Sequence, residues 1–351
     1  MTCVNASTRV LVYGAAGHTG RFVVEELLRR GLTPVVAGRS AERLADIAAF
    51  DALDQRVADT QHPDLLRQAL AGTGAVINCA GPFLDTGLPI ARAAVEVGAH
   101  YLDVTAEQAA VSELYRELDG PARDAGVSVV PAMAFYGGLA DLLVTAALDG
   151  EPGADAVEVA IGLDHWWPTT GTRVTGARNT ATRLVVRDGR LVPLTSPAPT
   201  GTWSFPAPLG EQAVVQLPFS EVVTITRHLE VGELTSFLSS ASLDELRDES
   251  TPSPPAARED GRSAQRFVVD VAVRRGATTR RLGAAGRDIY AVSAPVVVEG
   301  VVRLLDGRFR GPGAVAPGEA FDAADVLAAL AAHPAGLTLD GDAEARSGLV
   351  A

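Results

Sequence analysis

Short apolar runs alternate with segments of helical periodicity along the N-terminal part of the chain. The runs cover residues 9–13, 33–38, 55–58, 75–80, 100–104 and 127–131. Helical segments cover 20–30, 63–71 and 88–97, with a short helix after Ser40 and a longer one that we expect to break at Gly120–Pro121. This alternation is typical of a parallel sheet with helices on both faces. We therefore predict a Rossmann domain over residues 1–133, a doubly wound α/β fold with strand order 3-2-1-4-5-6.

Beyond Pro131 the chain changes to β-rich runs that lack long crossovers. We expect helices at 138–148 and near 172–186, and strands at 156–163, 213–217, 221–228 and 267–274. This pattern predicts a second, α+β domain over 134–289 with an antiparallel or mixed sheet, serving substrate binding or dimerisation. Residues 244–264, rich in Pro, Ser and charge, should form an exposed, mobile excursion. Helices near 292–305 and 322–333 form a C-terminal helical segment, 290–351.

The composition excludes several classes of function. A formal net charge of −13 argues against nucleic acid and anionic membranes, because both attract basic proteins. The chain has arginine but no lysine, which rules out a Schiff-base lysine and a Tyr-x-x-x-Lys pair. Two cysteines cannot build a disulfide framework, and residues 1–9 lack a signal-peptide pattern. We expect a cytoplasmic protein without a membrane span or a metal site.

Three glycines separate the first strand from the first helix. Gly14, Gly17 and Gly20 follow the strand at 9–13 directly and open a periodic helix. Glycine allows a sharp turn and the close approach of a pyrophosphate, and the helix N-terminus offers free N–H groups. The spacing alone also fits an ordinary tight turn, but its context favours a dinucleotide site. The other residues of this loop, which would lie beside the phosphates, are Ala15, Ala16, His18 and Thr19.

The end of the second strand indicates which dinucleotide binds. NAD sites usually carry an acid there, whereas this chain has none between Glu26 and Glu42 and reads Arg39-Ser40 instead. A guanidinium and a hydroxyl can bind a 2′-phosphate, so we predict NADP(H). The alternative is a solvated arginine beside a helix-capping serine. At the other strand ends we expect Asp59 near the adenine, Ala80, Gly81 and Pro82 near the nicotinamide ribose, and Phe83 near the substrate.

Several stretches together resemble one known family. GAAGHTGRFVVEELLRRG, VVAGRSAERL, NCAGPF, GLPIARAAVEVGAHYLDVTAE, VVPAMAFYGGLADLL and GRDIYAVSAPVVVEGVVRLL are similar to saccharopine dehydrogenase-like NAD(P)-binding reductases, most of all to the subgroup with the trans-acting enoyl reductases. The resemblance implies a Rossmann domain, an inserted substrate domain with an antiparallel sheet, a C-terminal helix that returns to the first domain, and hydride chemistry with NAD(P)H. It places the family's glycines at Gly14, Gly17 and Gly20. It places the two residues that bind the 2′-phosphate at Arg39 and Ser40. Residues 103–107 and 134–140 differ from the family's usual sequence, so the resemblance does not identify the substrate.

Tyr136 is the first candidate for catalysis. It follows the sixth strand, where the chain should leave the cofactor crevice for the second domain. Its phenol can donate a proton to a carbonyl, an imine or an enolate. A tyrosine ring packed at the domain junction is the alternative.

The segment DHWWPTTGT is the second candidate region. His165 can supply a proton while Trp166 and Trp167 wall an apolar pocket, or the three can end a hydrophobic hairpin beside solvent. A helix that begins here would be capped by Thr170 or Thr172. Its N-terminus, with Thr172 and Arg173, would then receive a carboxylate or carbonyl oxygen of the substrate.

We therefore predict an NADPH-dependent reductase that transfers hydride to a C=C, C=N or C=O bond of a small, largely apolar metabolite. One alternative is a non-catalytic NADP(H)-sensing partner protein, which suits the missing Tyr-x-x-x-Lys pair. Another is an opine-type, amine-forming dehydrogenase; it needs several cations, but Arg173, Arg178 and Arg183 would lie on diverging faces of one helix. The expected partner is a small-molecule substrate, with neither nucleic acid nor membrane, and the second domain offers a surface for a homodimer.

Overall fold

The N-terminal part of the chain folds into a parallel sheet. The computed structural model describes residues 8–342 except 48, 50, 259 and 335, together with the backbone of 349–350. The strands are β1 (Arg9–Tyr13), β2 (Thr33–Gly38), β3 (Asp54–Val57), β4 (Ala75–Asn78), β5 (His100–Asp103), β6 (Ser128–Val130) and β15 (Gly313–Ala314). Their order, β3-β2-β1-β4-β5-β6-β15, confirms the predicted Rossmann order and adds a strand from the C-terminal segment at one edge.

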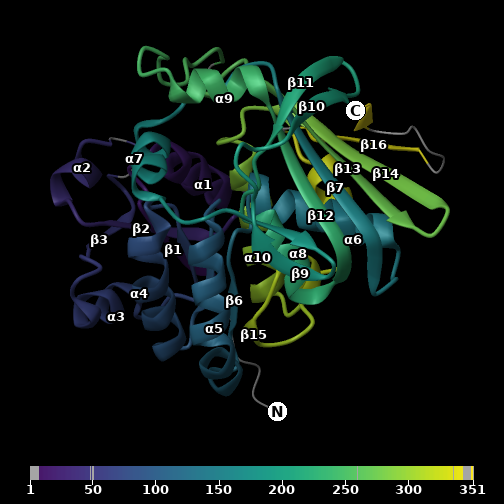
Figure 1. Cartoon of the computed structure of the whole chain (residues 1–351). Coiled ribbons are helices and arrows are strands. Elements are labelled where there is room, and N and C mark those ends of the chain that lie inside the picture. The colour runs from purple at the N-terminus through teal and green to yellow at the C-terminus, as the bar shows by residue number, and fades with distance from the viewer. Residues whose placement is uncertain are drawn as a thin grey trace.

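Helices cover both faces of this sheet (Figure 1). They are α1 (His18–Arg29), α2 (Ala41–Ala45), α3 (Pro63–Leu70), α4 (Phe83–Glu96), α5 (Gln108–Ala125) and, from the C-terminal segment, α10 (Ser293–Leu305). Alternate residues of β1 enter different cores because successive strand side chains point to opposite faces. Leu11 packs in the core shared with α3, α4 and α5, whereas Val12 packs in the core shared with α1 and α10.

Two helix boundaries differ from those predicted. Helix α4 begins at Phe83 rather than at residue 88, because the buried Glu107 carboxylate accepts hydrogen bonds from the Phe83 and Leu84 N–H groups. This long-range cap leaves no local signal in the sequence. Helix α5 does not break at Gly120–Pro121 but continues to Ala125. The exposed Pro121 costs the helix one hydrogen bond, which the buried apolar face of α5 outweighs.

The second domain is built on a mixed sheet of ten strands. They are β7 (Gly153–Leu163), β8 (Leu184–Arg187), β9 (Arg190–Pro193), β10 (Thr200–Ser204), β11 (Glu211–Gln216), β12 (Glu230–Ser239), β13 (Arg266–Arg275), β14 (Thr278–Arg287), β16 (Thr338–Asp342) and β17 (Leu349–Val350). The main order is β16-β14-β13-β7-β12-β11-β10-β17, with the hairpin β8–β9 attached to β12. Strands β7 and β12 pair in parallel and the other pairs are antiparallel, so the sheet is mixed.

Two expected elements of this domain were wrong. Residues 221–228 form helix α8 (Glu221–His228) rather than a strand, although the run is rich in β-branched residues. Helix α8 packs against α5, α6 (Ala140–Leu148) and β12, so tertiary packing overrides local propensity. The helix expected near 172–186 ends early: α7 spans Thr170–Arg178, and 184–187 is strand β8. The helix expected at 138–148 is present as α6, preceded by a π-helical turn at Phe135–Leu139.

The C-terminal segment packs back on the first domain. The predicted excursion, 244–264, begins inside helix α9 (Ser240–Arg247), and its other described residues are mostly exposed and without regular structure. The chain then returns through β13 and β14 to α10. Helix α10 packs against α1, and α12 (Ala323–Ala331) packs against α10 and α6, with α11 (Pro317–Ala320) beside α8. Among the described residues, no helix has both the length and the apolar character that a bilayer crossing requires.

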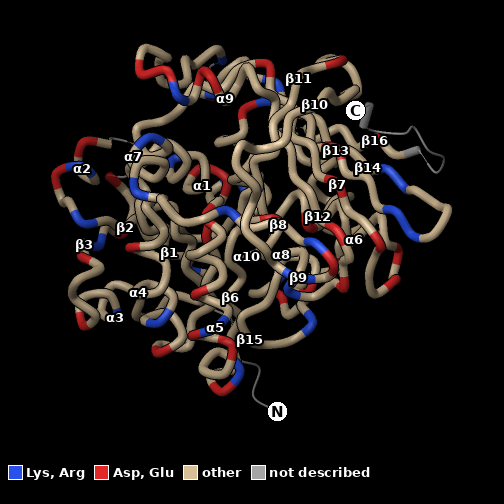
Figure 2. Tube along the Cα trace, viewed as in Figure 1, with Lys and Arg blue, Asp and Glu red and all other residues tan. Residues whose placement is uncertain are grey.

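Buried charges join the C-terminal segment to α1. Charged residues of both signs are spread along the chain (Figure 2), but Glu26 is buried between the C-terminal end of α1 and His333, which follows α12. Its carboxylate accepts from Arg29 Nε at 2.7 Å and Arg30 Nε at 2.6 Å, and His333 Nε2 lies 3.0 Å away. Although burial raises the pKa of Glu26, these hydrogen bonds hold it well below its usual value. Arg30 also binds Glu299 of α10, so the network fixes α10 against α1.

A second buried pair gives the fold a pH dependence. His228 Nε2 lies 2.8 Å from Asp141 Oδ1, and Gly318 N–H donates to the other oxygen at 2.8 Å. Burial lowers the pKa of His228, but the charge and hydrogen bond of Asp141 raise it more, so the net pKa is above 6.5. Stability from the charged pair is therefore fully present below about pH 6.5 and is lost as pH rises through the elevated pKa.

We expect His228→Gln to lower the free energy of unfolding by about 1.5–3 kcal/mol in mild acid and by less above the elevated pKa. Chemical denaturation at a series of pH values measures the difference. The exposed His62, which has no side-chain cap bond in α3, gives the matched control His62→Gln. An equal loss at every pH would show that the charged form of His228 contributes nothing.

Candidate dinucleotide site and domain junction

The glycine loop has the geometry of a phosphate-binding turn. Gly14 has φ of +81°, and a Cβ there would lie 2.9 Å from the Ala80 Cβ, so both conformation and space require glycine. A Cβ on Gly20 would collide with the Gly14 carbonyl oxygen. Gly17 is the N-cap of α1, and no side chain caps the helix. The uncapped N–H groups and the positive end of the helix dipole are thus available to an anion.

The end of β2 leaves one guanidinium free. Ser40 is the N-cap of α2 and accepts from Arg43 N–H at 3.2 Å, as its alternative interpretation proposed. Arg39 is exposed and makes neither a hydrogen bond nor an ion pair with any residue that the structure describes. Burial and the charge of Asp59 raise the pKa of Tyr13 to about 12 while Arg39 lowers it, which places Arg39 and Asp59 around the same hydroxyl. Asp59 also accepts from Gln61 N–H at 2.9 Å.

The loop after β4 is held in one shape by buried polar groups. Asn78 Oδ1 accepts from Ala80 N–H at 3.0 Å, and Thr86 Oγ1 donates to the Ala80 carbonyl at 2.6 Å. The Gly81–Pro82 peptide bond is cis. Phe83, the first residue of α4, is buried beneath the Glu107 cap. Asn78 and Glu107 therefore hold this loop in position.

Helix α7 lies over this loop. A Cβ on Gly81 would collide with Thr175 Oγ1, so the helix touches the glycine backbone. The N-cap is Thr169, whose Oγ1 accepts from Thr172 N–H at 3.0 Å, and not Thr170 or Thr172 as predicted. The helix buries none of its side chains. Polar bonds hold it, among them Arg178 with Asp85 at 2.9 Å.

Tyr136 and Trp166 meet in an aromatic cluster at the domain junction. The Tyr136 ring lies 4.2 Å from Phe219, 4.9 Å from Phe135 and 6.1 Å from Trp166, centroid to centroid. The Tyr136 hydroxyl is buried without a partner among the described residues. Burial raises its pKa well above 10, with Tyr290 and Glu221 adding to the rise, so the phenol stays protonated. An orphan hydroxyl of this kind is free to donate to a ligand.

Tyr290 connects this cluster to the glycine loop. Its hydroxyl accepts from Trp166 Nε1–H at 3.0 Å and lies 2.9 Å from Thr172 Oγ1 of α7. Its ring packs edge-on against His18 of the glycine loop at 5.4 Å. His18 Nε2 is itself buried without a partner in the described structure, and burial lowers its pKa. Tyr290 was not among the predicted site residues, although it lies in the GRDIYAVSAP stretch that carried the resemblance.

Asp288 fixes the position of Tyr290. One of its carboxylate oxygens accepts from the N–H groups of Tyr290 and Ala291, each at 3.0 Å, and the other accepts from Ser263 N–H at 2.7 Å. Asp288 adopts a left-handed φ of 59°, which an L residue rarely does without compensation. Its buried carboxylate supplies that compensation.

The other candidates in DHWWPTTGT face away from this cluster. His165 Nδ1 lies 2.8 Å from Glu245 Oε1 of α9, and its half-exposed ring stacks on Trp167 at 4.9 Å. Arg173 donates to the backbone carbonyls of Asp248 at 3.0 Å and Thr251 at 2.8 Å, just beyond α9. The structure brings Trp166 and Thr172 of this segment to the junction. It directs His165, Trp167 and the following Arg173 toward α9.

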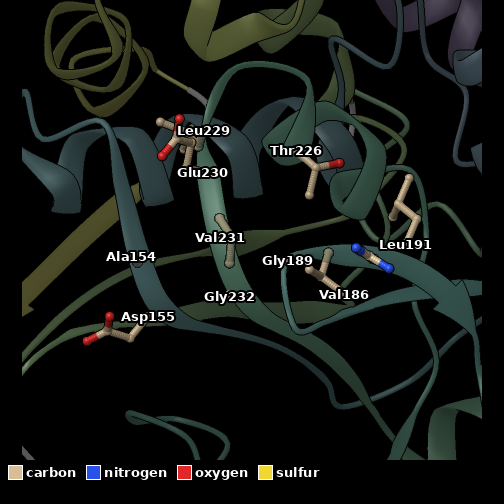
Figure 3. A pocket seen from close by; sticks show the side chains of 11 residues that line it. Ala154, Asp155, Val186, Gly189, Leu191, Thr226, Leu229, Glu230, Val231 and Gly232 are labelled. Atoms are coloured by element: carbon tan, nitrogen blue, oxygen red, sulfur yellow. The ribbon is translucent and has the colours of Figure 1, made fainter.

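A groove lies apart from this junction. Its volume is about 740 Å³, and it opens between the β8–β9 hairpin and the ends of β7 and β12 (Figure 3). Ala154, Leu191 and Val231 are among its lining residues, and none of the predicted site residues takes part. The described residues contain no cluster of three His, Cys, Asp or Glu side chains able to hold a metal ion.

The fold and the glycine loop are those of a dinucleotide-binding domain, and comparison with known proteins shows which domain family it resembles. Residues 10–130 match the family described as the saccharopine dehydrogenase NADP binding domain. Residues 10–130 therefore form a domain of this kind, and this part of the chain is similar to saccharopine dehydrogenase-like oxidoreductases.

Curated relatives share the N-terminal part. The human saccharopine dehydrogenase-like oxidoreductase is 30% identical over 152 residues, 38% of this chain and 35% of its own length. A lipid droplet localized protein of Caenorhabditis elegans is 33% identical over 148 residues, 38% of this chain and 34% of its own. A Mycobacterium tuberculosis protein provisionally named a trans-acting enoyl reductase is 30% identical over 155 residues, 42% of this chain and 36% of its own. The matched region thus spans about a third of these relatives.

Two solved structures share the fold over almost the whole chain. Saccharopine dehydrogenase (L-Glu forming) from Saccharomyces cerevisiae has a TM-score of 0.65 at 13% identity, covering 95% of this chain and 100% of that one. Homospermidine synthase from Legionella pneumophila, solved with NAD, has a TM-score of 0.66 at 11% identity, covering 96% and 91%. At such identities the likeness establishes the fold alone.

Proposed function

We propose that the protein is an NADPH-dependent reductase that transfers hydride to a C=C, C=N or C=O bond of a small, largely apolar metabolite. The observation that carries this proposal is the buried, unpartnered Tyr136 hydroxyl in a cluster joined through Tyr290 to the glycine loop. A phenol that is protonated before the reaction and lies beside a dinucleotide site is suited to completing a reduction with a proton.

Other residues of this chain are suited to binding the cofactor and to excluding water from the reaction. The uncapped N–H groups of α1 suit the pyrophosphate, and Arg39 with Ser40 suits the 2′-phosphate. Bound NADPH supplies the hydride at the nicotinamide. Tyr136 donates its phenolic proton to the atom of the substrate that gains negative charge, while Trp166 and Phe219 exclude water from that step. The α7 helix closes over the Gly81–Pro82 loop.

The opine-type alternative receives little support from the arginines. Arg173 is bound to backbone carbonyls and Arg178 is paired with Asp85, so neither is free for a second carboxylate of the substrate. An activity assay distinguishes the non-catalytic alternative from the reductase. NADPH consumption is followed by absorbance with a panel of enoyl, imine and carbonyl substrates. Tight NADPH binding without turnover on all three classes would favour a cofactor-sensing partner.

Cofactor choice has a separate test at Arg39. Because its guanidinium has no partner within the described structure, we expect Arg39→Gln to weaken NADPH binding about tenfold or more and to leave NADH binding unchanged. Calorimetric titration with both cofactors measures this. The exposed Arg116 on α5 supplies the control Arg116→Gln. Equal losses for NADPH and NADH would remove Arg39 from 2′-phosphate recognition.

The proposal also includes a cytoplasmic location and a homodimer formed through the second domain. Cys79 is a free thiol, in keeping with a reducing compartment. Strand β9 pairs only with β8 in the described sheet, so one of its edges is open to another chain. Light scattering of the purified protein measures the assembly.

A further inference from the structure

Arg183 is a cation beside the proposed proton donor. It follows α7 and precedes β8, and its Cζ lies 5.0 Å from the centre of the Phe219 ring. The Phe219 ring in turn lies 4.2 Å from the Tyr136 ring. Arg183 Nη1 donates to the Pro218 carbonyl at 2.6 Å, which fixes one side of the guanidinium. Reciprocal bonds between the Gln108 side chain and the Leu184 backbone, at 2.9 and 2.8 Å, hold this segment on the first domain.

Within the described structure this guanidinium has no counter-ion. No described carboxylate lies within ion-pair distance of it, and its one hydrogen bond to a described residue is to the uncharged Pro218 carbonyl. Glu221 is close enough to influence it, but the Glu221 carboxylate accepts from Phe219 N–H at 2.8 Å. Burial raises the pKa of Glu221, which favours its neutral form. Burial likewise lowers the pKa of Arg183, so the cation is incompletely compensated in this position.

The other arginines nearby are engaged or add positive charge. Arg173 and Arg178 are taken by carbonyls and by Asp85. Arg247, at the end of α9, is exposed and repels Arg183, which deepens the positive potential on this side of Tyr136.

We propose that Arg183 binds an oxyanion of the substrate, so that the substrate carries one acidic group, a carboxylate or a phosphate ester, on an apolar or aromatic body. The acidic group pairs with the guanidinium, and the body lies against Phe219 and Tyr136. A single unpaired arginine can pair with only one anionic group. We therefore expect a substrate with one acidic group rather than a dicarboxylate. The inference rests on the proposed reductase function for its biological meaning, but its test measures binding without hydride transfer.

Calorimetry with the NADPH-loaded, full-length protein tests the pairing. The probes are trans-cinnamate, phenyl phosphate and the neutral cinnamamide, which matches cinnamate in shape. We expect at least one of the two anions to bind, and cinnamamide to bind about tenfold more weakly than cinnamate or not at all. Preference for cinnamate over phenyl phosphate assigns a carboxylate substrate, and the reverse assigns a phosphate ester.

Arg183→Gln should lower the affinity for the bound anion about tenfold or more while NADPH affinity stays unchanged. Arg187→Gln, at the exposed end of β8, is the matched control and should bind the anion like the wild type. NADPH binding by both variants reports that they are folded. Equal affinity for anion and amide, no saturable binding of either anion, or an unchanged affinity in Arg183→Gln would overturn the proposal. Anion binding without any turnover would instead count against the reductase function alone.

Discussion

Replacing Gly20 with alanine is expected to lower the affinity for NADPH by at least about a hundredfold, equivalent to roughly 2.7 kcal/mol. The new methyl group would collide with the Gly14 carbonyl oxygen and lie 2.8 Å from the Ala15 Cα. Both are backbone atoms, so relief requires the whole turn to move. The turn cannot move freely, because Gly14 N–H donates to the Ala37 carbonyl at 2.8 Å and its Cα approaches Ala80.

A graded series makes this result specific. Gly17→Ala introduces a milder contact, 3.1 Å from the Gly14 oxygen, and should lose less affinity than Gly20→Ala. Gly120→Ala lies in α5 with open space around it and should bind NADPH like the wild type. Calorimetric titration gives the affinities, and circular dichroism confirms that each variant is folded. A folded Gly20→Ala variant with wild-type affinity would mean that the cofactor does not use this turn.

Changing Tyr136 to phenylalanine should lower kcat by about 10²–10⁴ without changing NADPH affinity. The ring stays in place against Phe219 and Trp166, and only the unpartnered hydroxyl is lost. Removing a buried polar group without a partner costs no folding stability and can raise it. The variant should therefore melt at or above the wild-type temperature while turnover collapses, a combination that a packing role would not produce.

Tyr115 offers the matched control. Its hydroxyl is also buried without a partner in the described structure, but it belongs to α5, away from the junction. We expect Tyr115→Phe to leave kcat unchanged with the substrate on which the wild type turns over. Full activity in Tyr136→Phe, or an equal loss in Tyr115→Phe, would show that Tyr136 does not supply the proton.

The fold of the first domain can be predicted from sequence because the patterns that indicate its strands, turns and helices are local. Strand, turn and helix follow one another at short range, so β1, the glycine loop and α1 can be placed together from their spacing. The absence of an acid between Glu26 and Glu42 is likewise a local fact. The ends of helices were harder to predict. Helix α4 begins earlier than expected because Glu107, which follows β5, caps it through a contact that is distant in sequence.

The second domain depends on contacts that its local sequence does not record. The β-branched run of α8 favours a strand, yet it folds as a helix because α5, α6 and β12 pack around it. Arg183 was expected on the same helix as Arg173, but α7 ends at Arg178 and the chain turns it toward Phe219.

The junction itself joins distant segments. Tyr290 meets Trp166 and His18 from a remote part of the chain, and a left-handed Asp288 sets its position. No spacing rule links these residues, so their proximity could only be seen in the folded molecule.

A crystal structure with NADPH bound would test the central claim most directly. We expect the pyrophosphate at the N-terminus of α1, the 2′-phosphate on Arg39, and the nicotinamide beside Gly81–Pro82 with its reactive face toward Tyr136. A 2′-phosphate that lies away from Arg39, or a nicotinamide that faces away from the Tyr136 cluster, would contradict the assignment of this junction as the site of an NADPH-dependent reduction.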